Sequence, residues 1–533
     1  MNAASANPPV GILAWLVGLG MRAQQSIQRH ERRCLFVTLA IFALLTAHHA
    51  CTTPLWFDEF FTFFISRLPS LPQMLRVIPA DGQPPLQYLL TRLSLLLFGQ
   101  SEFAIRLPEI LAYIAAGLLT YRIVRRHGSS VQALFATVTL LGSYVDFEHA
   151  FMARPYSLLL AFTALAFLCW QHAAVTGRRL IPALCGLALG IAGAVLSHHF
   201  GVLCAGIFLL PGEAARLCQR RRLDLWMAAA ILAGLSPLAF TLPLAHQSSR
   251  DLGQAILHSS TFWAKPSPLH LLGYVGMIAW PPICLFALFA FLPWPQRKTP
   301  ISSSSTVPVP AYEWAAAVGL SLLLPVLLVI SSFETGYFIS RYAISSSLGL
   351  ALLSGWALPR LPGLRAVAQP LLALSTLASL LFVGIFLLWA QFADPAQRGL
   401  KDANAVSPLL LNAPEGLPIV IASAFDYVPD WWYAPPSLRE RLVYLADPPY
   451  AARQADFLPE FTLILDRQAI PMPVSNYADY TAAHPRFLLL RSGLVRLNWT
   501  DTRLANSGWH LTPIAKSGSD ILYQVDHPLP LSP

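Results

Sequence analysis

Long apolar runs recur along the 533-residue chain, and they constrain its fold more than any single motif does. Hydrophobic residues make up 55% of the sequence and charged residues only 12%, against about a quarter in a typical soluble domain. The mean hydropathy is +0.53. Because a helix needs roughly 20 apolar residues to cross a bilayer, the sequence predicts a polytopic α-helical membrane protein.

Eleven apolar segments have the length, or nearly the length, of a membrane span. They lie at residues 34–52, 105–123, 131–147, 156–175, 180–197, 200–213, 225–245, 269–292, 313–333, 342–358 and 368–391. The segment 86–98 is too short for a span and contains Arg92. We expect it to form an amphipathic helix that lies on the outer surface of the bilayer.

Short basic clusters separate these segments and predict the orientation of the chain. The clusters contain Arg29, Arg32, Arg33, Arg122, Arg125, Arg126, Arg178, Arg179, Arg216, Arg220, Arg221, Arg222, Arg297, Lys298, Arg360 and Arg365. If the N-terminus is cytoplasmic, every cluster falls on the cytoplasmic side, as the positive-inside rule requires. The net charge of +9 is therefore interpreted as an orientation signal in a lipid bilayer, and no nucleic-acid partner is expected.

The pattern changes near residue 395, where strand-length apolar runs separated by Pro- and Asp-rich turns replace the long segments. Candidate strands lie at 417–422, 441–445, 486–490 and 521–525. They predict a small α/β domain. We therefore expect a cytoplasmic segment 1–33, a transmembrane domain 34–392 with an outer loop 53–104, and an extracytoplasmic domain 393–533, which is periplasmic in a Gram-negative source.

An acidic pair, Asp58 and Glu59, follows the first apolar segment within the aromatic run 56–61. Ionised carboxylates beside hydrocarbon are costly, so acids in such a setting are expected to serve function. A solvated turn or a helix cap is the structural alternative. Most unusual polar residues fall on the same outer side in this threading, so any reactive chemistry is expected to be extracytoplasmic.

Two further motifs follow on that side: residues 81–88, with Asp81 before paired prolines, and residues 98–108. In this order, after the first span, the three motifs resemble the integral-membrane GT-C glycosyltransferases. The likeness is greatest to glycosyltransferase family 39, which includes the protein O-mannosyltransferases and the bacterial lipid A aminoarabinose transferases. It covers about the first 200 residues and continues through the later tripeptide 340–342.

The resemblance implies a sugar donor carried on a polyprenyl phosphate and used on the outer face of the membrane. It matches Asp58 with the acidic residue that acts as catalytic base or organises the site, beside Glu59. A carboxylate within hydrogen-bond reach can accept the proton of an attacking hydroxyl group. A single displacement predicts inversion at the anomeric carbon, with a lipid, glycan or protein of the cell envelope as acceptor.

The resemblance also leaves a divalent metal cation open as a cofactor. Asp81 matches a position that binds metal in some relatives, and a turn-forming aspartate is the alternative. His198 and His199 lie at an outer turn, where some relatives carry a histidine that contacts metal or donor phosphate; a structural role is the alternative. Asp81, His198 and His199 are thus the candidate metal ligands. Glu59 and Asp81 are expected to hold either the acceptor or such a cation, so Asp81 is also a candidate substrate-binding residue.

Two arginine–aromatic segments are candidates for donor binding. Arg154 and Tyr156 open one span, and Arg341 and Tyr342 open another. The leaving group is a lipid phosphate, whose charge a guanidinium group can stabilise. Arg154 could instead snorkel to the interface, and Arg341 could pair with Glu334.

The stretch 425–436 is the most aromatic part of the C-terminal domain, and we expect it to pack that domain onto its membrane partner rather than to stack on sugars. The sequence as a whole predicts a polyprenyl-phosphate-sugar-dependent glycosyltransferase of the bacterial inner membrane. A flippase of lipid-linked sugars and a non-catalytic scaffold are the alternatives. A translocation path should place acids near the bilayer midplane, whereas these acids gather at one face.

Overall fold

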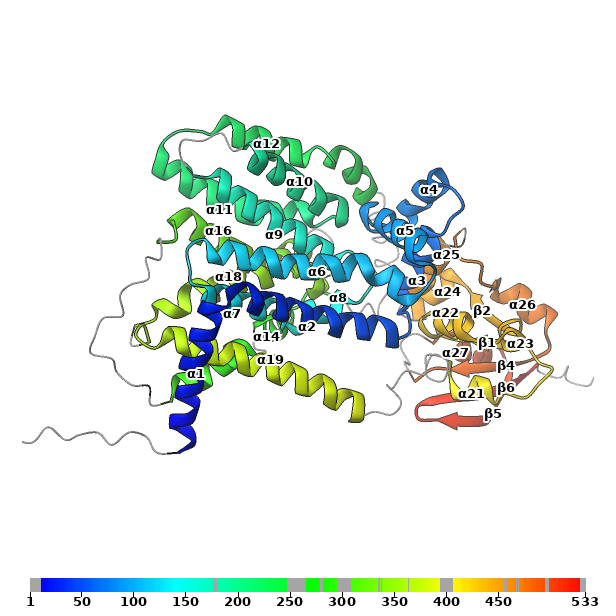
Figure 1. Cartoon of the computed structure of the whole chain (residues 1–533). Coiled ribbons are helices and arrows are strands. Elements are labelled where there is room, and N and C mark those ends of the chain that lie inside the picture. The colour runs from blue at the N-terminus through cyan, green and yellow to red at the C-terminus, as the bar shows by residue number, and fades with distance from the viewer. Residues whose placement is uncertain are drawn as a thin grey trace, which may run out of the picture. The chain divides into compact units, whose positions relative to one another are not determined.

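The computed structural model describes residues 11–175, 181–246, 265–278, 281–292, 294, 308–333, 336, 338–362, 364–393, 406–454, 458–465, 467, 469–493 and 498–527. The chain divides into two compact units (Figure 1). One, here called the helical unit, consists of Met1–Ala50, Arg106–Thr241 and Pro266–Ala393. The other, here called the mixed unit, consists of Cys51–Ile105, Leu242–Lys265 and Asp394–Pro533.

Five stretches of helix in the described part of the chain are long and apolar enough to cross a membrane. They are α2 (Glu31–Thr52), α6 (Glu102–Arg125), α9 (Tyr156–Ala173), α11 (Gly201–Arg220) and the part Ala368–Ile385 of α19 (Ala368–Ala393). Two bent pairs raise the number to as many as seven: α12 (Leu225–Leu235) with Leu238–His246, and α16 (Ala311–Ser321) with α17 (Leu323–Phe333). The predicted multi-pass helical architecture is confirmed, but the predicted eleven spans are not.

Several predicted spans are interrupted helices. The remaining elements of the helical unit are α1 (Ile12–Arg29), α7 (Ser130–Leu141), α8 (Tyr144–Ala150), α10 (Ile181–Ser197), η1 (Pro268–Leu272), α14 (Gly273–Ile278), α15 (Pro282–Ala290), η2 (Ser340–Ala343), α18 (Ser346–Ala357) and η3 (Leu358–Arg360). The predicted span 131–147 breaks because the Ser143 hydroxyl accepts a hydrogen bond from the Asp146 backbone N–H and so starts α8. The predicted span 342–358 starts within a 3₁₀ turn, and the regular helix α18 begins only at Ser346.

Small residues let neighbouring helices of this unit approach closely. A Cβ atom on Gly190 of α10 would lie 2.6 Å from the backbone N of Ala166 in α9. A Cβ atom on Gly349 of α18 would lie 2.4 Å from the backbone N of Ser321 in α16. Because hydrophobic burial gives little driving force inside a bilayer, close packing of this kind is what holds membrane helices together.

The mixed unit contains a six-stranded sheet of order β3-β2-β1-β4-β6-β5. Its strands are β1 (Ile419–Ile421), β2 (Leu442–Ala446), β3 (Val474–Asn476), β4 (Arg486–Arg491), β5 (His510–Ser517) and β6 (Asp520–Asp526). The strands β3, β2, β1 and β4 are parallel to one another, and β6 runs antiparallel to both β4 and β5. The predicted small α/β domain is confirmed.

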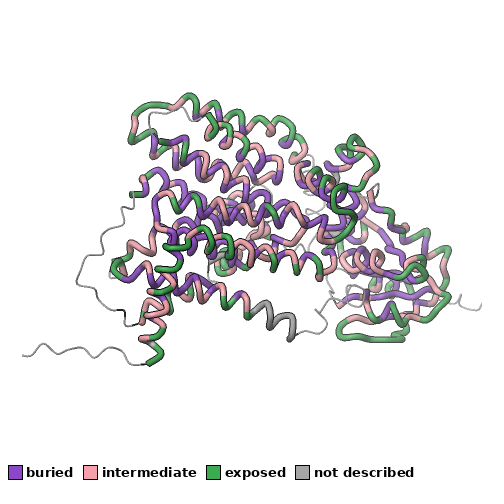
Figure 2. Tube along the Cα trace, in the orientation of Figure 1, coloured by how far each residue is buried: buried purple, intermediate pink, exposed green. Residues whose placement is uncertain are grey.

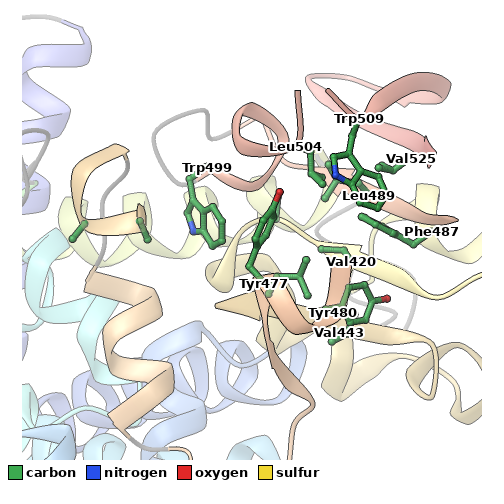
Figure 3. Close-up of a cluster of buried hydrophobic side chains, with 14 residues drawn as sticks. Val420, Val443, Tyr477, Tyr480, Phe487, Leu489, Trp499, Leu504, Trp509 and Val525 are labelled. Atoms are coloured by element: carbon green, nitrogen blue, oxygen red, sulfur yellow. The ribbon is translucent and has the colours of Figure 1, made fainter. Parts of the chain in front are cut away.

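Helices cover this sheet and enclose an aromatic core. They are α21 (Pro408–Leu411), α22 (Ala424–Tyr433), α23 (Pro436–Arg439), α24 (Pro448–Gln454), α25 (Leu458–Leu465), α26 (Tyr477–Ala483) and α27 (Thr500–Asn506). Figure 3 shows Trp499 beside Tyr477, with Phe487 and Trp509 at the other end of the cluster. The central strands are buried, whereas β5 is exposed along most of its length (Figure 2).

The outer loop belongs to the same unit and contributes α3 (Phe57–Ser66), α4 (Leu71–Asp81) and α5 (Leu86–Phe98). The predicted helix at 86–98 is confirmed as α5. Its buried residues are mainly polar, and its exposed residues are apolar: Leu89, Leu93, Leu96, Leu97 and Phe98. Such a surface suits a helix that faces lipid, as the sequence predicts.

Aromatic side chains join this loop to α22. The Trp432 ring of α22 lies 5.2 Å from the Phe63 ring and 6.2 Å from the Phe60 ring, both in edge-to-face geometry. The Phe425 ring lies 4.6 Å from the Phe57 ring. The aromatic stretch of the C-terminal domain therefore packs on α3, within its own unit, and the predicted packing onto the membrane-spanning part stays a prediction.

Candidate active site

The predicted acidic pair lies in the first turn of α3. Nine of the ten residues of this helix are buried, and Asp58 is the exception. Half of the residues of this helix are phenylalanine, and burial of these rings on several sides fixes its rotation. The carboxylate of Asp58 is thus held at the accessible side of a rigid element, near a helix N-terminus that favours its negative charge.

Glu59 has a different environment. Its side chain is only 1% exposed, and its Oε2 accepts a hydrogen bond of 2.8 Å from the backbone N–H of Trp56. The carboxylate therefore ties the chain that leads into α3 to the first turn of the helix. This geometry is that of a helix cap, which was the structural alternative for the acidic pair.

Asp81 is the last residue of α4, and Gly82 follows it in the left-handed conformation with φ of 69°. The hydroxyl group of Tyr88 in α5 donates a hydrogen bond to Oδ2 of Asp81. The paired prolines 84–85 lie between these two residues and start α5. Asp81 is therefore held where the chain turns from one outer helix into the next.

The predicted donor-binding residues of two distant segments lie together with His198 of a third segment in the helical unit: Arg154, Tyr156, Arg341 and Tyr342. The Arg341 guanidinium lies 5.6 Å from the centre of the Tyr156 ring. The His198 ring lies 5.7 Å from the Tyr156 ring and 5.4 Å from the Tyr342 ring. Arg154, buried just before α9, contributes positive charge to the same neighbourhood.

Of the two adjacent histidines, His198 is the one within this cluster. It follows the last residue of α10 and is 2% exposed, whereas His199 is partly exposed. Burial holds the pKa of the His198 imidazole well below its ordinary value, and neighbouring positive charges lower that pKa further. Nδ1 of His198 accepts a hydrogen bond from the Phe200 backbone N–H, so the neutral ring carries its proton on Nε2.

No three His, Cys, Asp or Glu side chains within the described ranges are placed to hold a metal ion. Asp81 belongs to the mixed unit, while His198 and His199 belong to the helical unit. The side chains described do not form a metal site within either unit. We therefore derive no step through a metal, and the metal ligation by Asp81, His198 and His199 stays a prediction.

One residue of this region has no counterpart in the sequence predictions. Glu109 of α6 is fully buried, and its Oε2 accepts hydrogen bonds from the backbone N–H groups of Ser157 and Leu158 at 2.8 and 3.1 Å. It caps the N-terminus of α9, the helix that Arg154 and Tyr156 introduce. The sequence signal is a lone acid inside an apolar span, which sequence reasoning could have singled out.

Asp146 of α8 is a second such residue. It is fully buried, and neither of its carboxylate oxygens makes a hydrogen bond with the described residues. The carboxylate of the nearby Glu148 interacts electrostatically with the Arg341 guanidinium. The region around the arginine–aromatic cluster therefore contains buried acids as well as guanidinium groups.

Comparison with known proteins gives a family model and a fold. Residues 82–240, less than a third of the chain, match the family model described as dolichyl-phosphate-mannose-protein mannosyltransferase. No curated protein sequence matches significantly. The chain is similar in structure to ArnT from Cupriavidus metallidurans in the apo state, with a TM-score of 0.58 and 12% identity. It is also similar to ArnT from the same organism bound to undecaprenyl phosphate, with a TM-score of 0.56 and 14% identity.

Both alignments cover 92% of this chain and 97% of the ArnT chain. The likeness therefore extends over the helical part and the C-terminal domain alike. It shows that the chain has the fold of this transferase. The predicted fold class, and the resemblance to GT-C membrane glycosyltransferases, are confirmed.

Proposed function

We propose that this membrane protein, which shares its fold with ArnT, transfers a sugar from a polyprenyl-phosphate donor to a hydroxyl group of a cell-envelope acceptor outside the cytoplasm. The observation that carries the proposal is the cluster of Arg154, His198 and Arg341, brought together from distant segments. A concentration of guanidinium groups with an aromatic wall suits a phosphate that leaves with its lipid. The ArnT structure with bound undecaprenyl phosphate supports a lipid phosphate as that group.

In the proposed reaction the two arginines bind the non-bridging phosphate oxygens of the donor. His198 remains neutral because its pKa is low, and its Nε2–H can donate a further hydrogen bond. As the bond from the anomeric carbon to the phosphate oxygen breaks, its electron pair stays on the phosphate. Fixed positive charge at that position stabilises the transition state.

Asp58 is the proposed general base. It accepts the proton of the acceptor hydroxyl while that oxygen attacks the anomeric carbon from the face opposite the phosphate. This single displacement inverts the configuration. Glu59 is assigned a positioning role, because its carboxylate already holds the first turn of α3.

The proposed setting is the inner membrane of a bacterium, with the N-terminus in the cytoplasm and the C-terminal domain in the periplasm. The basic clusters support this orientation through the positive-inside rule. The proposed acceptor is a lipid, glycan or protein of the cell envelope, because the reaction is assigned to the outer side of the membrane.

The test is a transfer assay with purified full-length protein, labelled polyprenyl-phosphate sugars and envelope acceptors, with and without a chelator. We expect transfer by the native protein and none by Asp58→Asn, with Asp479→Asn as a control at an exposed aspartate of α26. Full activity of Asp58→Asn would remove the base assignment. Movement of labelled lipid across vesicle membranes without transfer would favour the flippase alternative instead.

A further inference from the structure

The helical unit contains a groove of about 470 Å³ between α11 and α12 that the proposed reaction does not use. On α11 its lining runs from Val202 to Leu217, and on α12 from Met227 to Leu235. Most of this lining is apolar. Its charged members lie toward the end where the chain passes from α11 to α12: Glu213, Arg216, Arg222 and Asp224. The groove is thus apolar along its length and charged at one end.

The groove exists because α11 and α12 pack mainly on other helices and not on each other (Figure 1). α12 packs on α10, where a Cβ atom on Gly234 would lie 2.7 Å from Cβ of Ile191. α11 packs on α16, where a Cβ atom on Gly319 would lie 2.2 Å from the backbone O of Ile207. Small residues hold each helix against its own neighbour, and a gap remains between the two.

An ion-pair network joins the two helices at the charged end. Arg216 is only 2% exposed, and it pairs with Glu213 at 2.8 Å and with Asp224. Asp224 also caps α12, because its Oδ1 accepts a hydrogen bond of 3.2 Å from the Met227 backbone N–H. The charge of Arg216 is therefore already balanced within the protein.

The arginines beside this network present their charge to the surroundings. Arg221 and Arg222 are both exposed, and neither forms an ion pair with the residues that the structure describes. The segment 213–224 contains four arginines and two acids, so its net charge is +2. Trp226, in the first turn of α12, is 56% exposed. Exposed tryptophan beside arginine is typical of the headgroup level of a bilayer, so this end of the groove suits an anionic headgroup.

The length of the groove suits an acyl chain. From Val202 to Leu217 the helix rises about 22 Å, at roughly 1.5 Å per residue. One leaflet of the hydrocarbon core is about 15 Å thick, so a chain that starts at the charged end fits within the groove. Leu210 and Leu217 line it and are 73% and 43% exposed. Because α11 has the length and composition of a membrane span, exposure there is exposure to lipid.

We infer that this groove binds an anionic diacyl phospholipid, with one acyl chain between α11 and α12 and the headgroup phosphate against Arg221 and Arg222. Basic pockets between membrane helices bind such headgroups. A further protein helix does not fit, because a helix about 10–12 Å across would need several times the volume over this length. In the predicted orientation the lipid belongs to the cytoplasmic leaflet. The inference goes beyond the proposed sugar transfer and does not depend on it.

The test uses purified full-length protein in detergent and two matched probes, dioleoyl phosphatidylglycerol and dioleoyl phosphatidylcholine. Their acyl chains are the same, and only the first has a net negative charge. Native mass spectrometry with titrated lipid measures the affinities, and thermal melts measure the stabilisation. We expect phosphatidylglycerol to bind about ten times more tightly than phosphatidylcholine and to raise the melting temperature more.

Two variants test the two parts of the site separately. Gly206 lines the groove, and a Cβ atom there would meet no other atom within 4 Å, so Gly206→Leu fills the groove. We expect it to weaken phosphatidylglycerol binding at least tenfold. Gly384→Leu, at a position of α19 that is equally open, is the matched control and should leave binding unchanged. Arg222→Gln should weaken phosphatidylglycerol binding about fivefold and leave phosphatidylcholine binding unchanged.

Equal affinities for the two lipids, or native affinity for phosphatidylglycerol in both Gly206→Leu and Arg222→Gln, would overturn the inference. So would displacement of phosphatidylglycerol by an equimolar amount of undecaprenyl phosphate, or a native dimer that Gly206→Leu dissociates, since a second copy would then cover the groove. Thermal melts verify that each variant is folded. The titration contains no sugar donor, so its failure and the failure of the transfer assay are separate results.

Discussion

The carboxylate of Glu109 accepts a hydrogen bond of 2.8 Å from the backbone N–H of Ser157, so a side chain of α6 closes the start of α9. The same oxygen also accepts a hydrogen bond from the Leu158 backbone N–H. Both N–H groups are buried and have no helical acceptor in the first turn. Glu109 thereby fixes the point at which Arg154 and Tyr156 enter the candidate active site.

Glu109 is assigned no contact with the donor, but its replacement should weaken donor binding because it holds the start of α9 in place. We expect Glu109→Ala to lower the free energy of unfolding by about 1–2 kcal/mol, the usual cost of a lost cap, and to raise KM for the donor more than it lowers kcat. Glu109→Gln keeps an acceptor oxygen and should be milder on both counts. An unchanged KM and an unchanged melting temperature in Glu109→Ala would contradict this role.

The two members of the acidic pair should behave differently. Asp58→Asn is expected to reduce kcat by about 10²–10⁴-fold, the range of general acid–base catalysis, with little loss of stability. Glu59→Gln is expected to lower the melting temperature and to keep most of kcat, because its carboxylate serves the helix start. Transfer rates and thermal melts of both variants measure the difference, and equal loss of kcat in the two would refute it.

The phosphate-binding assignment predicts a loss of donor affinity. A hydrogen bond to a charged group contributes about 1.5–3 kcal/mol, so Arg341→Gln and Arg154→Gln should each weaken binding of undecaprenyl phosphate about 10-fold or more. Arg222→Gln is the control, since Arg222 is exposed and lies in a basic cluster assigned to orientation. Native mass spectrometry or calorimetry measures the affinities. Equal affinities for the Arg341→Gln variant and the control would remove Arg341 from the donor site.

Stability of the C-terminal domain should fall as the pH rises. The pKa of Asp430 is about 8 in the folded domain because of burial, and about 3.9 in an unfolded chain. Between these values the folded state binds more protons than the unfolded state, so the stability present below pH 4 is lost as the pH rises toward 8. Asp430→Asn should flatten the decline, leaving a smaller slope from Glu460, whose pKa burial raises to about 7.

Denaturant titrations of the native protein and Asp430→Asn at several pH values between 5 and 8, with a probe in this domain, measure that effect. Asp479→Asn, at an exposed aspartate, should keep the native slope. A native-like slope in Asp430→Asn would show that Asp430 is ionised in the folded protein.

The aromatic contact between α22 and α3 has a matched pair of test residues. Trp432 packs on Phe60 and Phe63, whereas the adjacent Trp431 lies under the Arg439 guanidinium. Trp432 also packs on Phe64, so Trp432→Ala loses three ring contacts. We expect it to cost about 2–4 kcal/mol and to speed proteolysis of the outer loop. Trp431→Ala should leave that cleavage rate unchanged, and equal rates in the two variants would contradict the packing role.

The sequence predicts the elements whose signals are local. The apolar runs give the multi-pass fold and α5, and the four short apolar runs after residue 395 all become strands. β3 and β5 escape prediction for a physical reason. β3 is only three residues long, and β5 is an exposed edge strand containing Pro513, so pairing with a neighbour, rather than an apolar pattern, makes each a strand.

Long-range contacts in the candidate site lie outside what one sequence can predict. The positions of Arg154 and Arg341 at the openings of two spans single them out, but the sequence does not show that the Tyr156 ring lies near both Arg341 and His198. The cap that Glu109 provides depends on a residue 48 positions away in the chain. The helix break at Ser143, by contrast, has a local sequence signal, the capping serine itself. The mean hydropathy of the whole segment hides that signal.

The phenylalanines of α3 also bear on how the polypeptide matures. The ribosome synthesises them hundreds of residues before the tryptophan that covers them. The hydrophobic rings of the new loop therefore stay exposed until the C-terminal domain has been synthesised. A protein shortened ahead of residue 406 would never receive that cover. We expect such a truncated protein to aggregate or to be degraded. The C-terminal domain would then be required for folding of the outer loop, whatever part it has in catalysis.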